Sequence, residues 1–291
     1  METRDVIAVA AVALLTIVAI VATGDPSWVA GIFGSPAPVP SPSPESSPSP
    51  EISPIPQPTA TPILLPNVKI TELVDPSCET CFNISRVSQN FIANSQALGL
   101  NFTAQAIDAS SNEGLELISR YNITKVPTML LSKEAGLSPA FMLAWEGSGT
   151  VEADGTLVLK EAYPPYIDLE SGAIAGNVTL VNLLYEPCGA CYDVALVETG
   201  LRERYGVSVF QVVDYSYDSI EWKEIVEKYN ITKVPAVLVS PELSAYPGVE
   251  EKWVGALGTK EQDGWFVFRS MDVPEAVYYD LLLNSTVQKI Y

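Results

Sequence analysis

The four cysteines of the chain lie in two Cys-x-x-Cys pairs, Cys78 with Cys81 and Cys188 with Cys191, which are 110 residues apart. Two thiols at this spacing can close a small disulfide loop, and two such pairs can also supply four sulfur ligands to a metal. Zinc knuckles are usually separated by about 15 to 20 residues, whereas 106 residues lie between Cys81 and Cys188. The spacing therefore favours two redox centres, with no metal and no cofactor.

The composition excludes several other kinds of chemistry. The chain has no histidine, the commonest general base and metal ligand, so catalysis by Ser-His-Asp or Cys-His groups is ruled out. Its formal net charge is −19, and such an acidic surface repels the phosphate backbone of nucleic acids. We therefore expect no nucleic-acid partner.

The second half of the chain repeats the first. Tyr121-Asn-Ile-Thr-Lys-Val-Pro127 recurs unchanged as Tyr229-Asn-Ile-Thr-Lys-Val-Pro235, and the Trp-x-Gly at residue 145 recurs at residue 253. Together with the cysteine spacing, this indicates one duplicated unit of about 110 residues. We place the first unit at residues 67–170 and the second at residues 171–291.

Residues 6–24 are predicted to anchor the chain in a membrane. Val6 to Thr23 are 18 uncharged residues rich in Ala, Val, Ile and Leu, and as a helix, at about 1.5 Å per residue, they would be roughly 27 Å long. A cleavable signal peptide is the alternative, although its apolar region is usually about 7 to 15 residues long. With residues 1–5 as a cytoplasmic tip, everything after residue 24 is expected to be extracytoplasmic.

Residues 25–66 are predicted to form a linker between the anchor and the folded units. From Ser35 to Pro66, 12 of 32 residues are proline, mostly alternating with serine. Such a segment cannot pack a core and is typical of an extended, semi-rigid spacer.

After residue 66 the hydrophobic pattern is that of a mixed α/β fold. In the first unit we expect strands at 68–74, 100–108, 128–132, 140–145 and 156–160, and helices at 81–98 and 113–121. In the second unit we expect strands at 178–184 and 207–213 and near Val237, Trp253 and Phe266, with helices at 191–205, 219–229 and 274–289.

Each cysteine pair is expected at the start of a helix that follows a strand. The helix N-terminus would stabilise the thiolate of the first cysteine, which makes Cys78 and Cys188 the attacking sulfurs and Cys81 and Cys191 the resolving ones. Acidic residues flank both pairs, and no basic residue lies within four residues of them. We therefore expect thiolates of only moderate stability and centres of middling or reducing potential.

The strand, the Cys-x-x-Cys pair and the Val-Pro some 45 residues later resemble the thioredoxin fold family. The duplication resembles the two-unit protein disulfide oxidoreductases of archaea, and the resemblance covers residues 67–291. It implies two tandem thioredoxin-like domains, each a central mixed sheet flanked by helices, after the membrane helix. It also implies thiol-disulfide exchange on protein substrates, together with a membrane redox partner if the chain acts as an exported reductase.

The resemblance assigns roles to residues outside the cysteine pairs. Pro127 and Pro235 are expected to follow cis peptide bonds, and the main chain of Val126 and of Val234 is expected to pair with an extended substrate. Glu72 would be the buried proton acceptor for the resolving thiol, since its alternation places it on the apolar face of its strand. The second unit has Asn182 at this position.

Three features depart from the family pattern. The residue before the first cysteine is Ser77 or Pro187 where the family usually has tryptophan, and the residues between the cysteines lack the familiar proline. An extra strand is expected after the hairpin of the first unit.

Two other interpretations remain open. The disulfides could be inert structural bridges, although a bridge that closes a four-residue loop constrains the chain little. The units could instead form a binding or chaperone-like module. Six Asn-x-Ser/Thr sites agree with export, and of these we favour Asn101, Asn177 and Asn284 for glycosylation.

Overall fold

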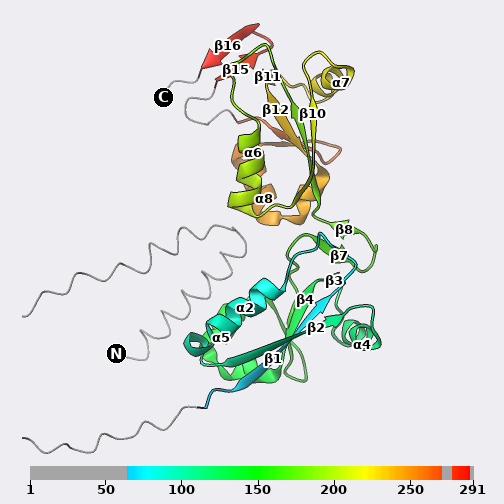
Figure 1. Ribbon diagram of the computed structural model, residues 1–291, viewed down its shortest axis with the longest axis vertical. Helices are drawn as coiled ribbons and strands as arrows, with labels where there is room; N and C mark the ends of the chain where they lie inside the picture. Colours follow the sequence, from blue (N-terminus) through cyan, green and yellow to red (C-terminus); the bar gives the residue numbers. More distant parts are fainter. Residues whose placement is uncertain (1–63, 271–276, 289–291) are drawn as a thin grey trace, which may run out of the picture.

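The computed structural model describes residues 64–270 and 277–288 (Figure 1). The predicted cytoplasmic tip, the anchor at 6–24 and nearly all of the linker at 25–66 lie outside these ranges. Within the described ranges, no helix combines the length and the apolar character that crossing a membrane requires.

The first unit is built on a five-stranded mixed sheet with the strand order β2-β1-β4-β6-β5. Strands β1 and β2 are parallel, and the remaining neighbours are antiparallel. The elements of the sheet and its helices are β1 (Asn67–Val74), α2 (Ser85–Ala93), α3 (Ser95–Leu98), β2 (Asn101–Asp108), α4 (Asn112–Tyr121), β4 (Thr128–Leu131), η2 (Lys133–Leu137), α5 (Pro139–Trp145), β5 (Gly149–Val151) and β6 (Leu157–Leu159).

The second unit repeats this sheet with the order β10-β9-β12-β14-β13. Its elements are β9 (Val178–Leu183), α6 (Ala195–Thr199), the π-helical turn η3 (Gly200–Arg204), β10 (Val209–Tyr215), α7 (Ile220–Lys228), β12 (Ala236–Val239), η4 (Pro241–Ala245), α8 (Pro247–Lys252), the π-helical turn η5 (Trp253–Leu257), β13 (Gly258–Lys260) and β14 (Phe266–Phe268). Both units therefore have the predicted mixed sheet flanked by helices, which is consistent with thioredoxin-like domains.

A small three-stranded sheet accompanies each large one. In the first unit it contains β3 (Lys125–Val126), β7 (Tyr166–Asp168) and β8 (Ile174–Ala175), so the sheet of this unit extends past the boundary expected at residue 170. In the second unit it contains β11 (Lys233–Val234), β15 (Val277–Asp280) and β16 (Ser285–Gln288). The hairpins β7–β8 and β15–β16 pair with the short strand just before the Val-Pro proline of their own unit.

The predicted terminal helix at 274–289 is wrong over its described part, because residues 277–288 form the hairpin β15–β16. Tyr278 and Tyr279 have a high strand propensity, and β15 gains main-chain partners on both sides, from β11 and β16. Asn284 has a φ of 51° in the connecting turn, a conformation that asparagine tolerates better than most residues. The two units thus end alike rather than differently.

The predicted strand at 140–145 is also wrong, because this segment is the helix α5. Ser138 accepts a hydrogen bond from the Phe141 N–H (3.2 Å), and Pro139 occupies the first turn, so the helix is capped. Phe141 and Trp145 lie four residues apart on its buried face. The extra strand expected after the hairpin of the first unit, at 156–160, is present as β6 (Leu157–Leu159), whereas Trp253 lies in η5 rather than in a strand.

Each sheet separates two apolar layers. In the first unit α2 and α5 cover one face and α4 covers the other (Figure 1). Rings dominate the first layer, where Phe141 contacts Phe91, Phe102 and Trp145. In the second unit α6 and α8 take the place of α2 and α5, and α7 takes the place of α4.

Candidate functional site

Each Cys-x-x-Cys pair closes its own disulfide in the turn after a central strand, Cys78–Cys81 after β1 and Cys188–Cys191 after β9. In both pairs the Cα atoms are 5.4 Å apart, and all four cysteines are partly exposed. The main-chain N–H of the first cysteine donates to the carbonyl three residues before it, at 3.1 Å in both units. We call these disulfides the first and the second centre.

The cysteines lie ahead of the helices rather than in their first turns. α2 begins only at Ser85 and α6 only at Ala195, so the predicted helix starts at Cys81 and Cys191 are wrong. The N–H of the residue after the second cysteine donates to a distant carbonyl, from Phe82 to Pro165 (2.7 Å) and from Tyr192 to Val277 (2.8 Å), and so does not enter a helix. Since the effect of a helix dipole falls off within one turn, its contribution to the thiolates is smaller than expected.

Glu72 is buried, as its alternation in β1 predicts, and only 5% of it is exposed. It lies among apolar residues on the face covered by α2, and the Ser85 hydroxyl donates to its Oε2 at 2.6 Å. In the second unit Asn182 is equally buried, and its Nδ2 donates to Asp214 at 2.8 Å. Its Oδ1 has no hydrogen-bond partner among the described residues. The two centres thus differ in the polar group beneath them.

The proline expected to face each centre follows a cis peptide bond, at Val126–Pro127 and at Val234–Pro235. At the second centre, Cys191 Sγ lies 4.0 Å from the carbonyl oxygen of Val234. The hydroxyl of Tyr192 donates to the carbonyl oxygen of Pro235 at 2.9 Å, and burial raises the pKa of this hydroxyl. The Cys-x-x-Cys turn and the proline loop are therefore connected directly.

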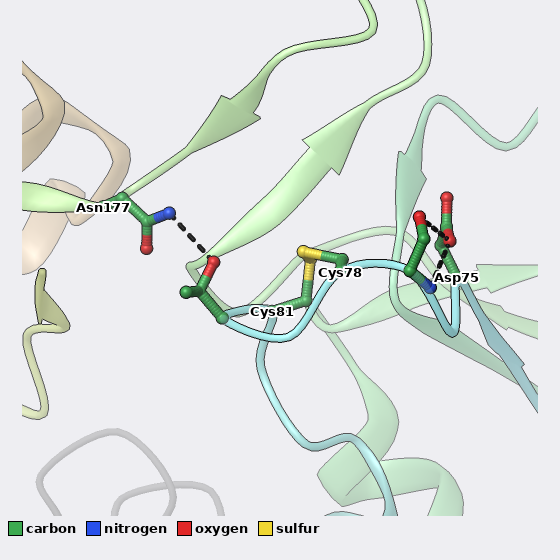
Figure 2. The surroundings of a disulfide bond; sticks show 6 residues. Asp75, Cys78, Cys81 and Asn177 are labelled. Carbon is green, nitrogen blue, oxygen red and sulfur yellow. Dashed lines mark hydrogen bonds between the residues drawn. A yellow bond between two sulfur atoms is a disulfide. The ribbon is translucent and has the colours of Figure 1, made fainter.

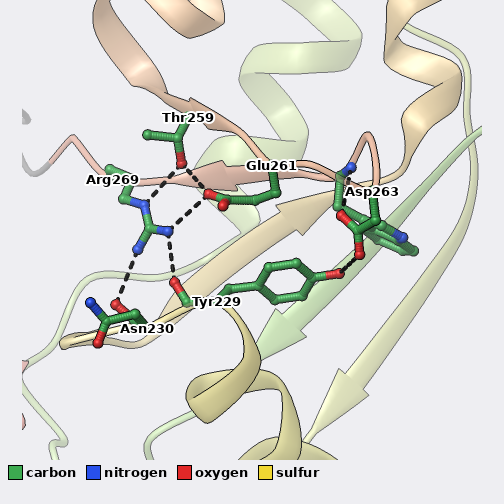
Figure 3. A network of polar contacts seen from close by, with 7 residues as sticks. Tyr229, Asn230, Thr259, Glu261, Asp263 and Arg269 are labelled. Atoms are coloured by element: carbon green, nitrogen blue, oxygen red, sulfur yellow. Dashed lines mark hydrogen bonds and ion pairs between the residues drawn. The ribbon is translucent and has the colours of Figure 1, made fainter.

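The repeated Tyr-Asn-Ile-Thr-Lys-Val-Pro segment holds the proline loop in place. In the second unit the Tyr229 hydroxyl donates to Asp263 (2.8 Å), and Arg269 donates to the Tyr229 carbonyl (2.8 Å) and to Glu261 (2.9 Å) (Figure 3). Asn230 has a φ of 48° just after α7. These contacts end the helix and direct the chain into β11.

The first unit uses the same contacts with one substitution. The Tyr121 hydroxyl donates to Asp154 at 2.8 Å, and Lys160 rather than an arginine donates to the Tyr121 carbonyl at 2.6 Å. Asn122 also has a φ of 48° and caps α4. Its Asn-x-Thr pattern is therefore explained by backbone geometry, as it is at Asn230.

The hairpins β7–β8 and β15–β16 pair with the strand before each proline loop, an arrangement that was not predicted from the sequence. Val126 stands opposite Ile167 of β7, and Val234 stands opposite Tyr279 of β15. The main-chain edge that was expected to receive a substrate thus faces the hairpin of the same chain. The duplication itself was the signal that could have revealed this, because both units continue past their last sheet strand into a similar stretch.

Negative charge lies close to the second centre. The backbone N–H groups of Glu186 itself and of Tyr217 hold the pKa of the Glu186 carboxyl below its usual range, so this group stays ionised. Next to it, desolvation and a hydrogen bond with Tyr279 raise the pKa of Tyr185 to about 12, so its hydroxyl stays neutral. The ionised Glu186 carboxylate, two residues before Cys188, opposes a thiolate on that cysteine, whereas the neutral Tyr185 adds no charge.

The surroundings of the two centres differ in polarity. Beside the first centre, Asp75 accepts hydrogen bonds from the N–H and the hydroxyl of Ser77, and Asn177 Nδ2 donates to Thr80 at 2.9 Å (Figure 2). Thr80 is partly buried, whereas Ala190 at the same position in the second pair is exposed. These side-chain contacts next to the first disulfide are therefore polar, and one of them comes from Asn177 at the start of the second unit.

A group of aromatic rings begins three residues before the second centre instead, at Tyr185. The ring of Tyr185 stacks on Tyr279 with centroids 4.6 Å apart and meets Tyr217 edge to face at 4.7 Å. Tyr217 in turn contacts Trp222 and is 41% exposed. This row of rings extends from the hairpin β15–β16 across the start of the Cys-x-x-Cys turn.

Comparisons with known proteins give only distant similarities. No family model matches the chain, and no curated protein matches it. Similar solved structures include a protein disulfide oxidoreductase from Aeropyrum pernix K1, with 16% identity, 60% of this chain and 77% of that chain covered, and a TM-score of 0.19. Others are a mutant of the alkylhydroperoxide reductase AhpF from Enterococcus faecalis (18% identity, 60% and 81% covered, TM-score 0.18) and human ERp44 (10% identity, 59% and 43% covered, TM-score 0.17). With scores this low, the function has to be argued from the geometry of this chain.

Proposed function

We propose that the chain is a thiol-disulfide oxidoreductase that acts on protein thiols and disulfides through the first and the second centre. The observation that carries this proposal is the repeated geometry of the site. In both units a partly exposed four-residue disulfide follows a central strand, and an X-Pro loop with a cis peptide bond comes later in the unit; at the second centre the two are in contact. A bridge that closes so small a loop adds little stability, so its presence twice is better explained by exchange chemistry.

The oxidised form seen here would react with a substrate that carries two thiols. A substrate thiolate attacks Sγ of the first cysteine, the intramolecular disulfide breaks, and the second cysteine leaves as a thiolate that takes up a proton. The second substrate thiolate then attacks the substrate sulfur of the mixed disulfide and releases the first cysteine. Two electrons and two protons pass from the substrate to the cysteine pair, and the reverse sequence reduces a substrate disulfide.

Glu72 would serve as the proton acceptor for Cys81 at the first centre. Its burial and its hydrogen bond with Ser85, four residues after Cys81, support this role. Asn182 cannot take up a proton in the same way. We therefore propose that the first centre exchanges faster than the second.

The proposal is tested with single-centre variants. Cys78→Ser with Cys81→Ser leaves only the second centre, and Cys188→Ser with Cys191→Ser leaves only the first. Each protein is treated with a mild dithiol, its free thiols are counted, and its equilibrium with glutathione is measured. Reversible appearance of two thiols per centre supports exchange, whereas pairs that stay closed under mild reduction would identify structural bridges.

We further propose that residues 6–24 tether the two units to a membrane on its extracytoplasmic side, where a membrane redox partner would renew the centres. The uncharged segment and the proline-rich spacer after it support this placement. The test is fractionation of the full chain against a chain that lacks residues 1–24. Recovery of both in the soluble fraction would contradict the anchor.

A binding module is the second candidate, and the exposed ring of Tyr217 beside the second centre favours it. Aromatic rings supply contact area at low cost in conformational entropy. The thiol titration separates the two functions, because binding without exchange needs no reducible disulfide. A polypeptide that binds equally well to the parent chain and to a variant with all four cysteines replaced by serine would support the binding function.

A further inference from the structure

The hairpin β15–β16 occupies the main-chain edge next to the second disulfide. The Leu281 N–H donates to the Thr232 carbonyl at 2.8 Å, which makes these two residues a hydrogen-bonded pair. In an antiparallel ladder such pairs alternate, so Val234 and Tyr279 form the next one. The N–H and C=O groups of Val234 are therefore engaged by β15.

This edge is the one that an extended substrate near the second centre would need. Cys191 Sγ lies 4.0 Å from the Val234 carbonyl oxygen, so a strand that pairs with Val234 would run past the disulfide. Main-chain pairing on a sheet edge is a common way to bind an extended peptide. Since β15 already fills this edge, such a peptide must compete with it.

Tyr279 holds β15 in this position at the second centre. Its ring stacks on Tyr185 at 4.6 Å, and its hydroxyl donates to Asn284 at the turn of the same hairpin. Tyr185 lies just before the Cys-x-x-Cys turn, and its carbonyl accepts the Cys188 N–H. The stack therefore joins the hairpin to the turn that contains the disulfide.

The first unit has the hairpin but not this stack. Ile167 stands where Tyr279 stands, opposite Val126. Asp75, whose carbonyl accepts the Cys78 N–H, takes the place of Tyr185. Within the described residues, the stacking of a hairpin tyrosine on a tyrosine just before the Cys-x-x-Cys turn is thus found only in the second unit.

We propose that Tyr279 is a specificity-determining residue of the second centre. By holding β15 on Val234, it excludes substrates that bind as an extended strand and leaves the Cys188–Cys191 disulfide to small thiols and to protein thiols that reach it without strand pairing. This inference rests on the proposed exchange function. It names the substrate class at one of the two centres.

The test uses the full chain with Cys78→Ser and Cys81→Ser, so that only the second centre reacts. The oxidised protein is mixed with dithiothreitol or with a reduced peptide whose two cysteines flank a strand-forming segment, and the second-order rate constants are compared. Tyr279→Ala is expected to raise the rate constant for the peptide about fivefold, the factor that follows from losing one aromatic stack that favours the closed hairpin. The rate constant for dithiothreitol should stay nearly constant.

Tyr278→Ala is the matched control. Tyr278 is the neighbouring residue on β15, but its ring meets Lys233 at 5.0 Å and makes no contact with Tyr185. This variant should leave the ratio of the two rate constants as it is. Tyr185→Ala removes the other half of the stack without altering the hairpin sequence, so it replaces Tyr279→Ala if that variant does not fold.

The outcomes separate this inference from the proposed function. A rise in the peptide rate constant in Tyr279→Ala or Tyr185→Ala, and not in Tyr278→Ala, supports the inference. An unchanged or lower peptide rate constant overturns it, because the hairpin would then be neutral or part of the peptide site. If the parent protein fails to react with dithiothreitol at all, the exchange function itself is wrong.

Discussion

The buried carboxyl group of Glu72 distinguishes the first centre from the second, and one substitution can test its role. Glu72→Gln keeps the shape of the side chain and leaves an oxygen that can still accept the Ser85 hydroxyl, now 2.6 Å from Oε2. The fold should therefore lose no more than about 1 kcal/mol, the net worth of an ordinary hydrogen bond. What the variant removes is a group that can take up a proton.

We expect the exchange rate of the first centre to fall about a hundredfold in Glu72→Gln. General acid–base catalysis contributes roughly 10² to 10⁴ in rate, and we choose the lower end because the Ser85 hydroxyl already occupies one carboxylate oxygen. The assay is single-turnover oxidation of the reduced first centre by glutathione disulfide across neutral pH: the Cys78 thiolate attacks the disulfide and releases one glutathione, and Cys81 must then lose its proton to attack Cys78 and release the second. It uses the variant with Cys188→Ser and Cys191→Ser, so that only the first centre reacts.

Two controls define the result. Ser85→Ala keeps the carboxyl group and removes its donor, so it should slow exchange much less than Glu72→Gln does. Glu72→Gln in the variant that retains only the second centre should leave the exchange rate of that centre unchanged, because Asn182, not Glu72, stands six residues before its first cysteine. Equal rate constants for Glu72→Gln and its parent across neutral pH would refute the proton-acceptor role.

Four further predictions concern stability and potential. Asn230→Ala should lower the free energy of unfolding by about 1 kcal/mol, because residue 230 has a φ of 48°, a left-handed conformation that alanine disfavours. Asn230→Gly should not lower it, because glycine adopts this conformation readily, and urea titrations can measure both variants. The hydrogen bond from the Lys228 ammonium group is the main cause of the lowered pKa of the Asp263 carboxyl. Their ion pair therefore stabilises the fold fully at pH values above the unfolded Asp pKa of about 3.9. This stabilisation is lost as the pH falls through the lower pKa that Asp263 has in the folded protein. Asp263→Asn should therefore be less stable at neutral pH but lose less stability on acidification. Phe141→Ala should cost about 3 to 5 kcal/mol in urea titrations, since Phe141 is fully buried among rings. The reduction potential of each centre against glutathione should lie below about −130 mV, more reducing than a strong oxidant such as DsbA.

Local spacing was enough to identify the parts of the site that are close along the chain. The cysteines three residues apart form the two disulfides. The alternation of β1 placed Glu72 in the core, because successive side chains in a strand point to opposite faces. The repeated Val-Pro segments identified the proline loops, since identical residues in both copies share one set of backbone contacts.

Elements without a strong local period were predicted wrongly. The run at 140–145 is short and apolar, and such a run fits a strand or a helix until its partners are known. The cap at Ser138 and the ring packing of Phe141 decided for a helix. The residues at 277–288 became a hairpin because β15 pairs with β11, which lies more than forty residues earlier in the chain.

By itself the sequence determined that there are two cysteine pairs, each followed by its proline loop, because both features are short motifs that recur in the two halves of the chain. Only the tertiary structure decided what surrounds them. Whether Glu72 meets Ser85, and whether Tyr185 meets Tyr279, depends on how distant strands and turns pack, and no local pattern encodes those distances. Two centres with the same motif therefore have different neighbours.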